Sequence, residues 1–208
     1  MLWDPVGDDN AEEQLMTVPG SSIELVVPTD ELVAAAQSLD GTIRVGTIAQ
    51  PRLDAGLPTY DVIPVEPFTK RYGLPPDELR DAIAHTQGSA ILARSGDRVV
   101  GRLRISEHWN RYAWIEDLVV DAGSRRLGAG RALMAWAEGW ARSRGLPGIM
   151  LETQNVNVAA CRFYERCGFV LGGFDQWLYR GFDPDTIEVA FFWYRDLRGK
   201  TVLHEPAM

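Results

Sequence analysis

Hydrophobic and polar positions follow a regular pattern from Ser89 onward. Short apolar runs are separated by turn residues, a pattern typical of strands and hairpins. It predicts strands at 90–94, 99–106, 112–120, 149–153, 169–178 and 188–194. One helix is expected after the turn 124–130 and ends at Arg144, and a second runs from Asn157 to Cys167. The first helix has an apolar face made of Leu133, Met134, Ala137, Trp140 and Ala141.

The pattern before Ser89 is more mixed. Ile23–Val27 predicts a strand and Glu31–Ser38 a helix, because each run is bounded by turn residues. Two more strands are expected at 43–49 and 60–65, and a helix that begins with proline at 76–85. The first 20 residues are polar, acidic and rich in turn residues. We therefore expect a flexible acidic segment at 1–20 and a single α/β domain at 21–208.

The net charge of −8 is concentrated near the N-terminus. Residues 1–43 contain nine acidic residues and no Lys or Arg, whereas the remaining 165 residues carry 20 acidic and 21 basic residues. The acidic part is either a solvated tail or a surface that recruits a cationic substrate. Since phosphate binding requires a basic face, nucleic acid is not an expected partner.

The sequence also restricts location and metal chemistry. It contains no run of 18 apolar residues and no basic-then-apolar leader at its start, so we expect a cytoplasmic protein without membrane contact. The two cysteines and three histidines lack zinc-site spacing, so no metal is expected. Cys161 is a poor candidate nucleophile because no histidine accompanies it. The sequence is compatible with a homodimer as well as with a monomer.

The strongest local feature is the turn Arg125-Arg126-Leu127-Gly128-Ala129-Gly130 between a strand and a helix. Backbone N–H groups at a helix start, next to glycines that admit close approach, favour binding of a pyrophosphate. The turn matches neither the Walker A pattern nor the dinucleotide fingerprint.

Two motifs together resemble the GNAT superfamily of acetyltransferases. Val120 through Gly130 resembles its acyl-CoA motif, although Arg126 stands where many relatives have glycine. The run Asn157-x-x-Ala160-x-x-Phe163-Tyr164-x-x-x-Gly168-Phe169 resembles the second half of its core. The resemblance implies an α/β fold with a mixed, mostly antiparallel sheet flanked by helices. It also implies that the sheet splays between its fourth and fifth core strands, 112–120 and 149–153, to admit acetyl-CoA.

Residues 89–196 are more specifically similar to streptothricin acetyltransferases. The matching segments are Trp109–Tyr112, Ile115–Asp117, Leu151–Gln154, Asn157, Ala160-Cys161, Phe163-Tyr164, Cys167–Phe169 and Phe192–Tyr194. The resemblance implies direct attack of a neutral amine on the acetyl-CoA thioester, with Tyr164 as proton donor to the thiolate. Among the acidic residues, Glu116 is the preferred base or ammonium anchor, and Glu152 on the neighbouring strand is a weaker candidate. The implied acetyl-CoA contacts are Leu118, Val119, Val120, Arg125, Arg126, Leu127, Gly128, Ala129, Gly130, Arg131, Asn157 and Tyr164. The candidate substrate contacts are Trp109, Tyr112, Trp114, Glu116, Asp117 and Glu152.

Each assignment has a structural alternative. Tyr164 also fits a core aromatic, and Asn157 also fits a helix N-cap. Adjacent strand residues point to opposite faces, so Glu116 and Asp117 are expected to do so, and Glu116 also fits a salt bridge. Trp109, Tyr112 and Trp114 fit either an aromatic wall for a cationic substrate or plain core.

Three functions remain open from the sequence. The first is N-acetylation of the β-lysine amine of streptothricin antibiotics, which would confer resistance. The second is acetylation of another amine, such as a protein lysine or N-terminus, a polyamine or an aminoglycoside. The third is a CoA-binding domain without catalysis, which Tyr164 and the strand carboxylates disfavour.

Overall fold

The computed structural model describes residues 16–17, 22–72 and 88–199. The helix expected at 76–85 and most of the segment 1–20 lie outside the described residues. No helix in the described part of the chain is long and apolar enough to span a membrane.

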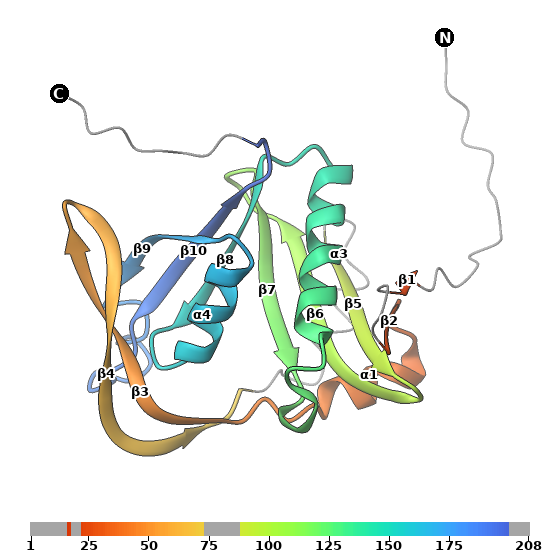
Figure 1. Cartoon of the computed structure of the whole chain (residues 1–208), viewed down its shortest axis with the longest axis horizontal. Coiled ribbons are helices and arrows are strands. Elements are labelled where there is room, and N and C mark those ends of the chain that lie inside the picture. The colour runs from red at the N-terminus through yellow and green to blue at the C-terminus, as the bar shows by residue number, and fades with distance from the viewer. Residues whose placement is uncertain (1–15, 18–21, 73–87, 200–208) are drawn as a thin grey trace, which may run out of the picture.

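The core of the fold is an eight-stranded sheet (Figure 1). Every neighbouring pair is antiparallel except β7 and β8, which are parallel. The mixed, mostly antiparallel sheet that the sequence predicted is therefore confirmed. In spatial order its strands are β1 (Met16–Thr17), β2 (Ile23–Val26), β5 (Gly88–Ser95), β6 (Arg98–Glu107), β7 (Ala113–Val120), β8 (Gly148–Gln154), β10 (Ala190–Asp196) and β9 (Val170–Asp175).

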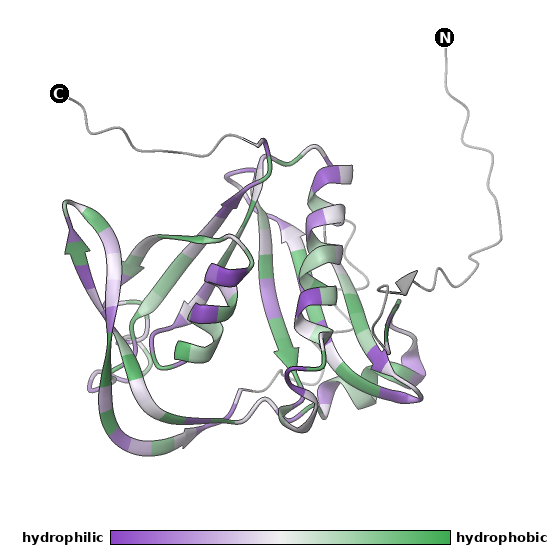
Figure 2. Cartoon of the chain, in the orientation of Figure 1, coloured by the Kyte–Doolittle hydropathy of each residue, from purple (hydrophilic) through white to green (hydrophobic). Residues whose placement is uncertain are grey.

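Helices cover both faces of this sheet. On one face, α3 (Ala129–Ser143) and α4 (Val158–Arg166) enclose the main core, and the predicted apolar face of α3 is buried there. On the other face, α1 (Asp30–Gln37) packs through Val33 and Ala36. A short 3₁₀ helix (Ala122–Ser124) follows β7. Figure 2 shows apolar stretches along the strands behind α3, while the helix itself alternates between polar and apolar residues.

The parallel pair β7 and β8 shares a short register. Ala113, Trp114 and Ile115 pair with Ile149, Met150 and Leu151, and both strands continue beyond these positions. Figure 1 shows the two strands diverging past this point. We call this point the fork, defined by the last registered pair, Ile115 and Leu151.

A second sheet is a long hairpin, β3 (Ile43–Asp54) and β4 (Leu57–Lys70). The sequence predicted shorter strands, 43–49 and 60–65, because the hairpin buries Val45, Ile48 and Ala49 but no residue of β3 or β4 after Ala49, and prolines and polar residues obscure the pattern there. Ala55 and Gly56 form its two-residue turn, with φ of 48° and 82°, which suits the twist of a tight hairpin. The strand predicted at 169–178 is also shorter than expected: it ends at Asp175, whose carboxylate accepts from the N–H groups of Trp177 and Leu178.

Candidate active site

The turn between β7 and α3 carries the predicted phosphate-binding residues. Gly128, the N-cap of α3, has a φ of 96°, and Arg126 has a φ of 70°. Glycine adopts this left-handed conformation freely, whereas a residue with a side chain is strained by about 1–3 kcal/mol. Because the N-cap has no side chain, it leaves the first N–H groups of α3 free of side-chain capping. The turn therefore presents backbone donors suited to an anion.

Two residues of this turn also have structural contacts. Arg125 donates from Nε to the Val120 carbonyl at 3.3 Å and from Nη2 to the Thr42 carbonyl at 2.8 Å. A Cβ on Gly130 would lie 3.3 Å from the Phe163 ring, so this glycine allows α3 to approach α4. These contacts hold the turn against β7 and α4. Arg125 and Gly130 thus have structural roles besides the acetyl-CoA contact expected of them.

The β8-facing edge of β7 lies beside this turn. Past Ile115, the residues Asp117–Val120 pair with β6 on one side, while the register with β8 has ended. An edge of this kind offers N–H and C=O groups to an extended ligand. Leu118, Val119 and Val120, expected to bind the pantetheine arm, lie on this stretch.

Asn157 and Tyr164 both lie on α4, which follows β8. Asn157 is the N-cap, and its Oδ1 accepts from the Ala160 N–H at 3.1 Å. The capping alternative is thus observed, and the side-chain NH₂ group has no hydrogen-bond partner among the described residues.

Tyr164 is 6% exposed and packs against Phe163, Phe169 and Trp193 with ring centroids 5.5–6.2 Å apart. Tyr164 is therefore a core aromatic, which is the structural role that the sequence offered as an alternative. Its hydroxyl nevertheless has no hydrogen-bond partner in the described part of the chain. Burial raises the pKa of Tyr164, and the nearby Glu152 carboxylate adds to this. The phenol consequently stays protonated at neutral pH, as a proton donor must.

Glu116 and Asp117 differ from the sequence prediction. Asp117 pairs with Arg104 and Ile115 with Ile105, so Glu116 is an extra residue that forms a β-bulge. A bulge redirects side chains, and both carboxylates contact alternate residues of β6, which share one face of the sheet. The expectation that Glu116 and Asp117 point to opposite faces is therefore wrong.

The two carboxylates are held by arginines. Glu116 accepts from Arg104 Nη2 at 2.8 Å and from the Ser106 hydroxyl at 2.5 Å. Asp117 accepts from Arg102 Nε at 2.7 Å, and the same guanidinium donates to the Ala36 carbonyl at 2.6 Å. The salt-bridge alternative for Glu116 is thus observed in the structure.

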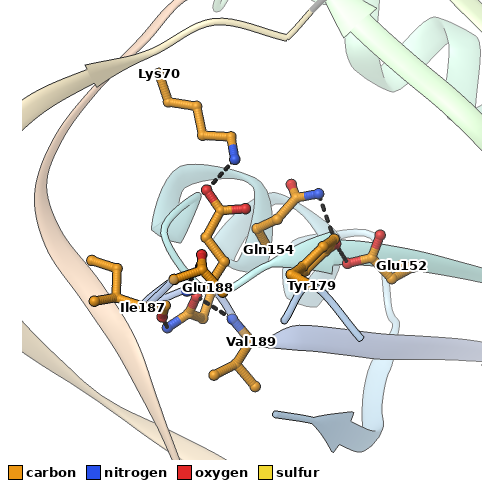
Figure 3. A network of polar contacts seen from close by, with 9 residues as sticks. Lys70, Glu152, Gln154, Tyr179, Ile187, Glu188 and Val189 are labelled. Atoms are coloured by element: carbon orange, nitrogen blue, oxygen red, sulfur yellow. Dashed lines mark hydrogen bonds and ion pairs between the residues drawn. The ribbon is translucent and has the colours of Figure 1, made fainter. Parts of the chain in front are cut away.

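Glu152 lies on β8 in a different environment (Figure 3). The Tyr179 hydroxyl donates to its carboxylate, and Gln154 donates to the Tyr179 oxygen at 2.7 Å. Glu188, close by, is paired with Lys70. Burial, aided by the charge of Glu188, raises the pKa of Glu152 to about 6, against the opposing effects of Tyr179 and Lys70.

The residues of the predicted aromatic wall have different ring partners. Trp114 contacts His108 with ring centroids 5.4 Å apart, and Trp109, which is 88% exposed, contacts the same imidazole at 5.7 Å. Tyr112 instead packs edge-on against Tyr194 at 5.5 Å.

Sequence reasoning missed three members of the polar network, namely Tyr179, Glu188 and Lys70. Tyr179 and Glu188 lie in the connection between β9 and β10, and Lys70 is the last residue of β4. No local motif marks them, because they meet Glu152 through the tertiary fold alone.

Comparison with known proteins places these features in a family. The acetyltransferase (GNAT) family profile matches residues 58–169. Streptothricin acetyltransferase A of Bacillus subtilis (strain 168) is 38% identical over 130 residues, covering 62% of this chain and 73% of that protein. Streptothricin acetyltransferase of Streptomyces lavendulae is 31% identical over 176 residues, covering 80% of this chain and 92% of that protein.

Solved structures give the same result. A Bacillus anthracis str. Ames protein named for streptothricin acetylation, crystallised with acetyl coenzyme A, matches 84% of this chain and 99% of its own, with a TM-score of 0.77 and 35% identity. Nourseothricin acetyltransferase matches 85% and 99%, with a TM-score of 0.71 and 30% identity. The glycine turn, the open strand edge and the capped helix of this chain, together with these matches, show that it belongs to the GNAT family of acetyltransferases.

Proposed function

We propose that this enzyme transfers acetyl from acetyl-CoA to the β-lysine amine of streptothricin-type antibiotics and thereby confers resistance. The observation that carries the proposal is the similarity to named streptothricin acetyltransferases, one of which aligns over 80% of this chain. An alignment of 176 residues extends well beyond the acyl-CoA motifs.

The acetyl-CoA site follows from the geometry of the turn and of β7. The pyrophosphate would bind the N–H groups at the start of α3, with Arg126 and Arg131 close enough in the chain to add positive charge. The pantetheine arm would extend β7 along Leu118–Val120, and the Asn157 NH₂ group would bond it from α4. This arrangement brings the thioester to the fork, near Tyr164, whose proton would go to the departing thiolate.

The acceptor side carries negative charge that suits a cationic amine. Glu152 lies at the fork without an ion pair among the described residues, and an open groove of about 480 Å³ runs along β9 and β10. Phe192 lines this groove and pairs directly with Glu152 across β8 and β10, so the two share a face. Asp175, Trp177 and Tyr194 line the rest of the groove together with Gly172, Gly173, Phe174 and Gln176.

The test is acetyl-CoA turnover with streptothricin beside lysine peptides, spermidine and an aminoglycoside. We expect the highest kcat/KM with streptothricin, a product acetylated at the β-lysine moiety, and protection of a sensitive bacterium that expresses the enzyme. Turnover of another amine with none for streptothricin would contradict the proposed acceptor while leaving the family assignment intact.

A further inference from the structure

Two carboxylates lie at the fork on the same face of the sheet. Glu116 directly follows Ile115, and Glu152 directly follows Leu151, the last registered pair of β7 and β8. Ile115 and Leu151 point into the main core, so the residues that follow them point to the opposite face, on which the Glu116 ion pair lies. Either carboxylate is therefore placed to meet an amine that approaches the end of the strand pairing.

Their partners distinguish the two carboxylates. Both oxygens of Glu116 are engaged, one by the Arg104 guanidinium and one by the Ser106 hydroxyl. Glu152 has the Tyr179 hydroxyl on Oε1, while Oε2 accepts no hydrogen bond from the described residues. No Lys, Arg or His in the described part of the chain forms an ion pair with Glu152. An arriving ammonium would thus find a free oxygen on Glu152, whereas at Glu116 it would have to displace an arginine.

We propose that Glu152, rather than Glu116, is the catalytic residue that accepts the proton of the acceptor ammonium. The proposal rests on the proposed acetylation of an amine, but not on which amine it is. Tyr179 is a positioning residue, because its hydroxyl holds one carboxylate oxygen and leaves the other for the substrate.

The proton balance of the step is complete. The acceptor R–NH₃⁺ gives one proton to Glu152, and the neutral nitrogen forms a C–N bond with the acetyl carbonyl carbon. The C–S electron pair leaves with the sulfur, which takes a proton from Tyr164, while the nitrogen loses a second proton that restores Tyr164. Glu152 then releases its proton to water, so that R–NH₃⁺ and acetyl-CoA yield R–NH–acetyl, CoA–SH and H⁺.

The electrostatic surroundings of Glu152 suit a base at neutral pH. A pKa of about 6 leaves the carboxylate ionised at pH 7 yet more basic than an exposed glutamate. Burial is the main cause of this raised pKa. The Tyr179 hydroxyl and the Lys70 ammonium lower the pKa, and the Glu188 carboxylate raises it. Tyr72, just after β4, has a buried hydroxyl without a partner in the described structure. Burial, and to a lesser extent the charges of Glu188 and Glu152, raise the pKa of Tyr72. Neither Tyr72 nor Tyr164 therefore competes for the proton.

The deciding experiment compares Glu152→Gln with Glu116→Gln, using whichever amine the wild-type enzyme acetylates. The kcat/KM of the wild type should fall below about pH 6 as Glu152 becomes protonated. Glu152→Gln should lose about 100-fold at pH 7 and lose this acidic limb, with activity recovering at high pH where more amine is already neutral. Glu116→Gln should keep the limb and lose less than about tenfold.

Tyr179→Phe gives an independent readout that a merely structural role would not move. It removes a hydrogen bond that lowers the pKa of Glu152, so the acidic limb should shift to higher pH. Acetyl-CoA affinity, measured by calorimetry, should stay at the wild-type value in all three variants.

An unmoved acidic limb in both Glu152→Gln and Tyr179→Phe, or loss of the limb in Glu116→Gln, would overturn the proposal. Failure of streptothricin as substrate would leave it standing, because the comparison then uses the amine that is turned over.

Discussion

The carboxylates on the two sides of the fork have different partners. On the β7 side, Asp117 and Glu116 each face an arginine from β6, at 2.7 and 2.8 Å. On the β8 side, Glu152 is bonded by a tyrosine, and the nearby Lys70 is paired with Glu188. The first half uses its carboxylates to hold the fold, and it also carries the glycine turn. The second half keeps the Glu152 carboxylate free of an ion pair among the described residues, on the face of the sheet opposite the main core.

The largest loss of stability is expected from removing an arginine that pairs with a carboxylate of β7. Arg102 is 1% exposed, and its guanidinium joins Asp117 on β7 to the Ala36 carbonyl on α1. Arg102→Met should lower the free energy of unfolding by about 3–5 kcal/mol, because Asp117 is left as an uncompensated charge in a largely buried site. Urea denaturation would measure the loss.

A matched control is Arg52→Met. Arg52 pairs with Asp61 at 3.1 Å on the hairpin β3–β4, and the two side chains are 44% and 62% exposed, so neither is left buried and the loss should be below about 1 kcal/mol. Equal losses in the two variants would show that the Arg102 pair does not organise the β7 half.

The second prediction concerns the β8 half and its chemistry. Tyr164→Phe keeps the ring contacts with Phe163, Phe169 and Trp193 and removes a hydroxyl that has no partner in the described structure. The free energy of unfolding should change little, while kcat falls about 100-fold or more if the hydroxyl protonates the thiolate. Stopped-flow measurement under conditions where chemistry limits turnover checks this, and wild-type kcat would return Tyr164 to a purely structural role.

The third prediction sharpens the assignment of acetyl-CoA binding to the β7 half. Gly128→Asp introduces a negative charge next to the expected pyrophosphate and forces a side chain into a φ of 96°. Acetyl-CoA affinity should fall ten- to hundredfold, or about 1.4–2.8 kcal/mol. Gly128→Ala carries the same backbone strain without the charge, so it separates the two causes in calorimetry. Unchanged affinity in a folded Gly128→Asp variant would remove the turn from the site.

Sequence predicted much of the framework around the fork. Gly128 and Asn157 lie at helix starts, and Tyr164 lies on a helix beside the expected cleft, because caps, turns and periodicity are local properties. The bulge at Glu116 was not predictable, since one extra residue in a ladder leaves no mark on the pattern of β7. The length of the hairpin β3–β4 was underestimated because none of its residues after Ala49 is buried, so that part lacks the alternation of a half-buried strand.

The environment of Glu152 illustrates the same limit. Its partner Tyr179 lies 27 residues away, and the Lys70–Glu188 pair joins residues 118 positions apart. Sequence identified Glu152 as a candidate contact, but its rank against Glu116 depended on which carboxylate an arginine would neutralise. That difference depends on the register between β6 and β7 and on the path of the connection between β9 and β10. No local motif encodes either of them.

The difference between the environments of Glu152 and Glu116 is tested most directly by the stability of Glu152→Gln as a function of pH. Folding raises the pKa of Glu152 from an ordinary value of 4.5 to about 6. The unfolded chain therefore releases this proton first, and the wild type loses stability as the pH rises through this window. Since each pKa unit corresponds to about 1.4 kcal/mol, Glu152→Gln should be about 1–2 kcal/mol more stable than the wild type at pH 8, with no gain from this source at pH 4.

Glu116→Gln is the matched variant, and it should lose stability at pH 8 because Arg104 loses the charge of its partner. The measurement is urea unfolding of both variants and the wild type at pH 4 and pH 8. A gain for Glu152→Gln that appears at pH 8 alone, beside a loss for Glu116→Gln, is the predicted result. A loss of stability for Glu152→Gln at pH 8 would contradict the account, since it would mean that the fold neutralises Glu152 as it does Glu116.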